Sequence, residues 1–130
     1  MSVLLLDTTV LIDALRGRPA AGRMLQAHAG GEVLFTSALN VEEVYRGLLA
    51  SEEGVARRLF DGLRIVALGR SEAEQAGRWR REHAGRGRTL SQGDCLVAAA
   101  ALSIGARLAT GNPKDFPMPE LEVEVWPVGA

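Results

Sequence analysis

Several acidic side chains stand next to the ends or beginnings of the elements that the sequence predicts. Asp7 directly follows an apolar run, Asp94 lies in the first turn of an expected helix, and Asp115 lies in the loop after another apolar run. Glu42 and Glu43 lie near the start of a further expected helix. Carboxylates that converge at one sheet edge repel each other unless a cation lies among them, and oxygen donors alone favour Mg²⁺ or Mn²⁺. Because such ions organise phosphodiester hydrolysis, these residues predict a metal-dependent site.

Each carboxylate also has an ordinary structural interpretation. Asp7 can cap the helix that follows it, because aspartate accepts backbone N–H bonds at that position. Asp94 stands three residues after Ser91, which is the spacing of a capping box. Asp115 can stabilise a turn between two prolines. Taken singly, none of these residues is specific for a metal, and for Asp94 alone the cap is the favoured interpretation.

The helix that contains Glu42 and Glu43 does not decide between them by its periodicity. At about 100° per residue, its apolar face consists of Val41, Val44, Tyr45 and Leu48. Glu43 points away from the centre of that face, and Glu42 lies on its flank. Gly47 follows Glu43 by one turn and leaves space that suits a metal or a substrate backbone.

Apolar runs alternate with helical patterns, which predicts a parallel sheet with helices on both faces. Strands are expected at residues 3–6, 33–36, 64–68, 107–110 and 123–126. Helices are expected at 10–16, 20–29, from a cap at Ser37 or Asn40 to about 50, at 55–63, 71–83 and 91–104. Such sheets bind ligands outside the carboxyl ends of their strands, where Asp7 and Asp115 are expected.

The composition is that of one globular domain, which we place at residues 1–130. Hydrophobic residues make up 47% of the chain and charged residues 24%, which excludes a disordered tail, a collagen and a coiled coil. The longest apolar run has eight residues and no basic segment begins the chain, so we expect neither a membrane span nor a signal peptide. The single cysteine, Cys95, fits a reducing cytoplasm and is expected to be buried.

The net charge of −1 does not indicate a nucleic-acid binder, but the arginines are unevenly distributed. Six of the fourteen lie between Arg70 and Arg88, in a helix and the loop after it. We interpret this stretch first as a solvated face, and second as a phosphate contact through Arg86 and Arg88. In the same helix, Trp79 is expected to pack in the protein and His83 to lie on the surface.

Four segments in chain order resemble the PIN-domain ribonucleases. They are LLLDTTVLID around Asp7, EVYRG from Glu43, DCLVAAAAL from Asp94 and LATGNPKDF through Asp115. The resemblance covers essentially the whole chain, whose length is similar to that of VapC, the toxin of bacterial toxin–antitoxin pairs. It implies a three-layer α/β/α sandwich with a four- or five-stranded parallel sheet, a homodimer, and inhibition by a cognate VapB-type antitoxin.

The resemblance also implies a catalytic role for four acidic residues. Asp7, Glu43 and Asp94 match the three acidic positions of the family, and Asp115 matches a fourth that is less regular. Asp7 and Asp94 would bind Mg²⁺ or Mn²⁺ directly. Glu43 would bind the ion through water or orient the attacking water. The implied reaction is metal-dependent cleavage of RNA, with Arg86 and Arg88 as candidate contacts to the substrate.

Two further positions near the last acidic residue match the family. Thr110 matches a hydroxyl that supports the site, and Asn112 stands where some members have an aspartate. Asparagine can coordinate a metal through its carbonyl but adds no negative charge. The number of ions that the site holds is therefore left open.

Other protein classes begin with an aspartate after the first strand. A haloacid-dehalogenase-type phosphatase needs a second aspartate at position 9, which is Thr9 here. A receiver domain needs an acidic pair near Asp7 in the first strand-to-helix connection, which the sequence lacks. A non-catalytic PIN-like module that only binds RNA or a partner remains as the alternative to an enzyme.

Overall fold

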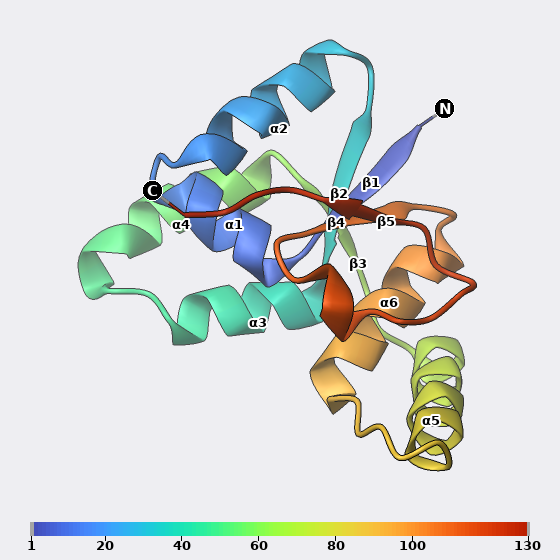
Figure 1. Ribbon diagram of the computed structural model, residues 1–130. Helices are drawn as coiled ribbons and strands as arrows, with labels where there is room; N and C mark the ends of the chain where they lie inside the picture. The colour runs from blue at the N-terminus through green and yellow to red at the C-terminus, as the bar shows by residue number, and fades with distance from the viewer. Residues whose placement is uncertain (1, 130) are drawn as a thin grey trace.

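The centre of the structure is a parallel sheet of five strands in the order β3-β2-β1-β4-β5 (Figure 1). The computed structural model describes residues 2–129. The strands are β1 (Val3–Leu6), β2 (Val33–Ser37), β3 (Arg64–Val66), β4 (Arg107–Thr110) and β5 (Val123–Val125). All neighbouring strands are parallel, which confirms the predicted sheet and gives it five strands.

The middle strand, β1, is apolar on both sides because helices cover both faces of the sheet. Leu5 belongs to one core cluster, while Leu4 and Leu6 belong to the other, and none of the three is exposed. Side chains of a strand point alternately to opposite faces, so a strand covered on both sides is a continuous apolar run. This double burial fixes Asp7, the next residue, at the carboxyl edge of the sheet.

The α-helices form a layer on each face of the sheet (Figure 1). They are α1 (Thr8–Leu15), α2 (Pro19–Ala29), α3 (Ala38–Arg46), α4 (Glu53–Asp61), α5 (Arg70–Ala84) and α6 (Gln92–Ser103). Residues of α1 to α4 contribute to the core on one face, and residues of α5 and α6 contribute to the core on the other. The predicted three-layer α/β/α sandwich is therefore confirmed. Within residues 2–129, no helix has the length and apolar character needed to cross a bilayer.

Several predicted boundaries differ from the structure. The helices expected at 10–16 and 55–63 are Thr8–Leu15 and Glu53–Asp61, and each begins two residues early. Three other differences have a local cause. The helix expected to reach residue 50 ends at Arg46, because Gly47 is its C-cap and a separate 3₁₀ turn, Ala50–Glu52, follows. The strand expected to reach residue 68 ends at Val66, which pairs with the last residue of β2. The final strand ends at Val125, although the Trp126 N–H still donates to the Thr110 carbonyl at 2.9 Å.

The start of α3 shows which of the two candidate residues is the cap. Ser37 is the N-cap, and its hydroxyl accepts a hydrogen bond from the Asn40 N–H at 3.3 Å. The Asn40 side chain accepts a hydrogen bond from the Ser37 N–H at 3.2 Å, which completes a capping box. Both residues are fully buried, so α3 begins at a fixed point directly after β2.

The inner face of α5 is more buried than the sequence predicts. His83 is only 7% exposed, and its Nδ1 donates to the Trp79 carbonyl one turn earlier at 2.9 Å. The prediction of a surface histidine is wrong, because residues 76, 79 and 83 share the helix face that packs on the core. Trp79 packs as predicted, and its indole N–H donates to Glu120 at 3.0 Å. Cys95 is buried, also as predicted.

Helix α6 approaches the sheet closely because its inner residues are small. Ala98, Ala100 and Ala101 have no exposed surface.

We expect Ala100→Leu to lower the free energy of unfolding by about 1–3 kcal/mol, because added methylene groups overfill a tight core. Ser103→Leu adds bulk at an exposed position of the same helix and serves as the control. Equal stabilities of the two variants in urea denaturation would contradict the close contact.

Candidate active site

A cleft of about 280 Å³ opens at the carboxyl edge of the sheet, beside the end of β1. β1 lies between β2 and β4, so the strand order reverses at this point. Open α/β sheets bind ligands in the crevice that such a reversal creates. The cleft is lined by Asp7, Thr8, Thr9, Ile12, Glu43, Arg46, Gly47, Asp94, Asn112 and Asp115. All four acidic residues that the sequence singles out therefore line one cleft.

Asp7 is the most buried of these carboxylates, with 7% of its surface exposed. Its Oδ2 accepts a hydrogen bond from the Thr110 hydroxyl at 2.7 Å, and its Oδ1 lies 3.5 Å from the Asn40 amide nitrogen. Burial raises the pKa of Asp7, and the carboxylates of Asp94 and Glu43 raise it further against the opposing hydrogen bonds. Asp7 occupies the N-cap position of α1, but its side chain makes no capping bond. Its carboxylate is thus directed to the cleft.

Asp94 lies in the first turn of α6, and neighbouring carboxylates affect its pKa. The Ser91 hydroxyl accepts a hydrogen bond from the Asp94 N–H at 3.0 Å, which is one of the two bonds of the predicted capping box. Burial raises the pKa of Asp94, a side-chain hydrogen bond with Ser91 opposes this, and the carboxylates of Asp115 and Glu43 add to the increase. These mutual effects place the acidic side chains within electrostatic reach of each other.

The structure distinguishes the two neighbouring glutamates of α3. Glu43 lines the cleft, and its Oε1 accepts a hydrogen bond from the Thr8 hydroxyl at 2.7 Å. Its Oε2 lies next to Gly93 at the start of α6. Glu42 is exposed and does not line the cleft. Tertiary contacts with α1 and α6, which the periodicity does not contain, direct Glu43 inward.

The loop after β4 supplies the remaining predicted residues. Thr110 is fully buried, donates to Asp7, and accepts a hydrogen bond from the Asn112 N–H at 3.0 Å. The Asn112 side chain lines the cleft, as does Asp115 from the 3₁₀ turn Pro113–Asp115. The hydroxyl of Thr110 therefore links the backbone of this loop to the carboxylate of Asp7.

Four polar residues of the site were missed by sequence reasoning about function. Thr8, Thr9 and Asn40 hydrogen-bond to the acidic residues. Arg46 lines the cleft from the last turn of α3. The S-x-x-N spacing of Ser37 and Asn40 is a signal for a cap, and nothing in it reveals a second contact with β1. Arg46 stands three residues after Glu43, which is the spacing of neighbours on one helix face.

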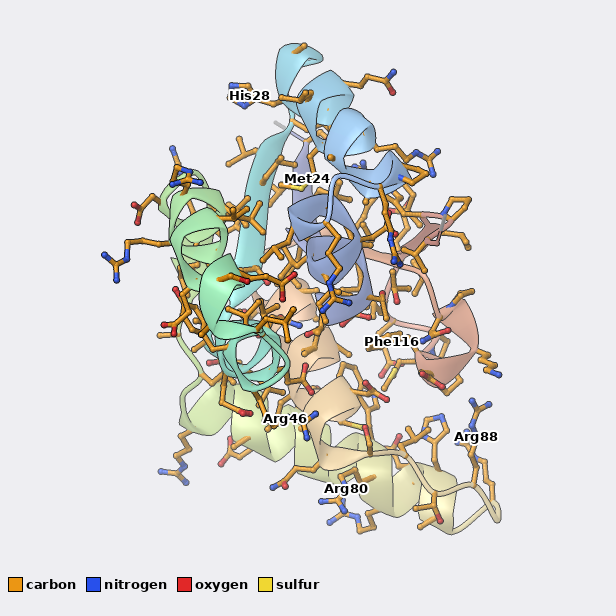
Figure 2. All side chains as sticks on the ribbon, turned by 90° about the vertical axis from the view of Figure 1, so that its left-hand side faces the viewer. Met24, His28, Arg46, Arg80, Arg88 and Phe116 are labelled. Carbon is orange, nitrogen blue, oxygen red and sulfur yellow. The ribbon has the colours of Figure 1, made fainter. Side chains whose placement is uncertain are left out.

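Arg86 and Arg88, the two arginines predicted to contact the substrate, do not line the cleft. Arg86 and Arg88 are exposed in the loop after α5, and Arg88 donates a hydrogen bond to the Lys114 carbonyl beside Asp115. Figure 2 shows Arg46, Arg80 and Arg88 in the lower part of the molecule. The three residues come from different segments, namely α3, α5 and the loop after α5. Cationic groups are thus available near the cleft for an anionic ligand.

The donor chemistry of the cleft fits a hard divalent cation. Carboxylate and amide oxygens line it, and no histidine or cysteine does. No three acidic, histidine or cysteine side chains in the described part of the chain are already close enough to hold an ion. Burial is the main cause of the raised pKa values of Asp7 and Asp94, and repulsion between the carboxylates adds to it. A cation between the carboxylates would relieve that repulsion.

Comparisons with known proteins agree with this geometry. The PIN domain family matches residues 4–117. Ribonuclease VapC19 of Mycobacterium tuberculosis is 33% identical over 120 residues, which cover 91% of this chain and 96% of that protein. Ribonuclease VapC36 of the same species is 34% identical over 138 residues, which cover 95% of this chain and 98% of that protein.

Solved structures share the fold. VapBC2 from Rickettsia felis, bound to a DNA fragment of its promoter, superimposes with a TM-score of 0.85 at 21% identity and covers 95% of this chain and 98% of that chain. A toxin–antitoxin complex from Klebsiella pneumoniae superimposes with a TM-score of 0.72 at 27% identity and covers 98% and 99%. The likeness extends over the full sheet and both helical layers.

Asp7→Asn tests the repulsion in the cleft. In chelator at neutral pH, we expect the variant to melt at a higher temperature than the natural chain, because the folded protein disfavours the ionised form of Asp7. Because the pKa of Asp7 is higher in the folded state than the ordinary value of 3.8, the natural chain loses stability as the pH rises from 3.8 through the folded-state pKa. The advantage of the variant should therefore vanish below pH 3.8, where the carboxyl is protonated in both states.

Thermal melts with and without Mn²⁺ complete this test. A ligand that binds only the folded state stabilises it, so Mn²⁺ should raise the melting temperature of the natural chain and that of Asp7→Asn much less. If Asp7 is only a helix cap, asparagine replaces it with little change. Equal responses of the two proteins to Mn²⁺ would then remove Asp7 from the metal site.

Proposed function

The chain belongs to the PIN domain family, and on that premise we propose that it is a VapC-type endoribonuclease whose acidic cleft hydrolyses RNA. One observation carries the proposal: Asp7, Glu43, Asp94 and Asp115 come from four separate segments and line a single cleft. Converging carboxylates raise the energy of one another, so a cation bound among them would stabilise the arrangement. The ribonuclease relatives cover nearly the whole chain, which supports the same reaction here.

Asp7 and Asp94 are the proposed direct ligands of a divalent cation, and we assign Mg²⁺ or Mn²⁺ from the oxygen donors. A cation held there would polarise a phosphate oxygen and make water a better nucleophile. The Thr110 hydroxyl holds Asp7 at Oδ2, so the ligand keeps its orientation. Asp115 completes the acidic cluster, and Asn112 offers a neutral carbonyl oxygen beside it.

Glu43 is the proposed residue that orients the attacking water. Its Oε1 is occupied by the Thr8 hydroxyl, which leaves Oε2 on the side of α6 to accept a hydrogen bond from water. Arg46, at the same cleft, is placed to contact a phosphate of the substrate. The three functions of ligand, water orientation and phosphate contact thus fall on different side chains.

Family membership also supports two partners and a location. We propose a cognate VapB-type antitoxin as inhibitor, since solved relatives are toxin–antitoxin complexes. We also propose a homodimer as the assembly, which rests on the resemblance to VapC alone. A ribonuclease of this type acts on cellular RNA, so we assign it to the cytoplasm. A PIN-like module that binds RNA without cutting it is the alternative, and a cleavage assay separates the two.

Cleavage of single-stranded RNA should require Mg²⁺ or Mn²⁺ and should depend on one glutamate of α3. Glu43→Gln should lower turnover by a factor of at least about 10², the scale expected for a positioned general base or water-orienting group. Glu42→Gln, at the exposed neighbouring position, is the matched control and should leave turnover nearly unchanged. Undiminished cleavage in excess chelator, or an inactive Glu42→Gln, would contradict the assignment. Binding of RNA with no cleavage under any condition would favour the non-catalytic module.

Arg86 and Arg88 are tested by the salt dependence of RNA binding. If both contact phosphates, replacing them with alanine should weaken binding and reduce the slope of log K against log salt by about 1 to 1.5. Arg70→Ala with Arg78→Ala removes the same charge from α5 away from the loop and is the control. Unchanged binding by the Arg86 and Arg88 variant at every salt concentration would identify these arginines as a solvated face.

A further inference from the structure

Asn40 is a fully buried amide whose orientation is fixed by its neighbours. Its Oδ1 accepts hydrogen bonds from the Ser37 hydroxyl at 2.6 Å and from the Ser37 N–H at 3.2 Å. Because two donors meet this atom, it must be the carbonyl oxygen, and the amide nitrogen must point the other way. The Nδ2 group therefore faces β1 and the cleft.

The orientation of the Asn40 amide decides what the Thr8 hydroxyl can do. Nδ2 donates to the Thr8 Oγ1 at 2.9 Å, so this oxygen acts as an acceptor toward Asn40. A hydroxyl has a single proton, which remains free to be donated elsewhere. It is donated to Glu43 Oε1 at 2.7 Å. The chain of bonds from Ser37 through Asn40 and Thr8 to Glu43 thus runs in one direction.

The same amide also faces Asp7, a second acidic residue of the cleft. Asn40 Nδ2 lies 3.5 Å from Asp7 Oδ1, on the side opposite to the Thr110 hydroxyl that donates to Oδ2. Asn40 is therefore the one side chain in these contacts that links Asp7 with the hydrogen-bond donor of Glu43. Both contacts that its Nδ2 makes toward the cleft are with oxygen atoms, Thr8 Oγ1 and Asp7 Oδ1.

We propose that Asn40 and Thr8 are positioning residues that hold Glu43 and Asp7 ready for the cation. This inference rests on the proposed function, because it assigns a role toward the same metal site. Half of the Asn40 amide already completes the capping box of α3, so the cap needs only Oδ1. The Nδ2 half makes no contribution to that cap and instead reaches Thr8 and Asp7.

Thr8 provides the cleaner variants, since Asn40→Ala also removes a cap bond and will lower the melting temperature. Thr8 is partly exposed at the first position of α1, outside the cap of α3. Thr8→Val removes the hydroxyl and keeps the shape, whereas Thr8→Ser keeps the hydroxyl. Calorimetric titration of the chelator-treated protein should give an Mn²⁺ dissociation constant that is raised roughly tenfold or more in Thr8→Val. Thr8→Ser should stay within about twofold of the natural chain, and kcat on RNA should follow the same order with little change in KM.

A double-mutant cycle tests whether Thr8 acts through Glu43. If it does, Thr8→Val should weaken Mn²⁺ binding much less in a Glu43→Gln background than in the natural chain, because the partner of the hydroxyl is already altered. Equal losses in both backgrounds, or a Thr8→Val protein that binds Mn²⁺ like Thr8→Ser, would overturn the positioning role while the proposed function stands. A natural chain that neither binds Mn²⁺ nor cleaves RNA would overturn both.

Discussion

The mutual repulsion of carboxylates in one cleft is the constraint on which the functional part of this structure depends. Burial and neighbouring charges raise the pKa values of Asp7 and Asp94, so the folded chain holds these groups in a state of higher energy than in water. Hydrogen bonds from the Thr110 hydroxyl and the Thr8 backbone oppose the shift at Asp7. The side chains of Thr8 and Asn40 contact oxygens of Glu43 and Asp7 and fix their direction. The folded chain therefore holds these oxygens in place by itself, as the proposed cation site requires.

The hydrophobic core on both faces of the sheet supplies the stability that offsets the cost of holding the acidic side chains close together. Leu4, Leu5 and Leu6 are divided between two hydrophobic clusters, which anchors β1 on both faces. Pairing of β1 with β4 then brings Thr110 to Asp7, although 103 positions separate them along the chain. The Ala-rich inner side of α6 keeps Asp94 close to the same edge. Burial of apolar surface on both faces is thus what holds the charged edge in place.

The arginines near the cleft provide local positive charge for binding RNA, although the whole protein is nearly neutral. The net charge of −1 gives no long-range attraction for RNA. Arginines nevertheless lie close to the cleft, with Arg46 in its lining and Arg88 bonded to the carbonyl of Lys114 beside Asp115. In such an arrangement, recognition depends on local contacts and on the shape of the substrate more than on overall electrostatic attraction.

The sequence by itself determined the order of strands and helices, the layered fold, and the positions of Asp7, Asp94 and Asp115 at element ends, because these follow from local periodicity and from the PIN-type segments. The choice of Glu43 over Glu42, which periodicity left open, followed from the PIN-type segment, and the structure places Glu43 in the cleft. Only the tertiary structure decided that His83 is buried and that Asn40 reaches β1. The physical reason is the separation in sequence of the residues that interact. Periodicity reports which residues share a face, whereas a contact such as that of Thr8 with Glu43, 35 positions apart, exists only once the layers have packed.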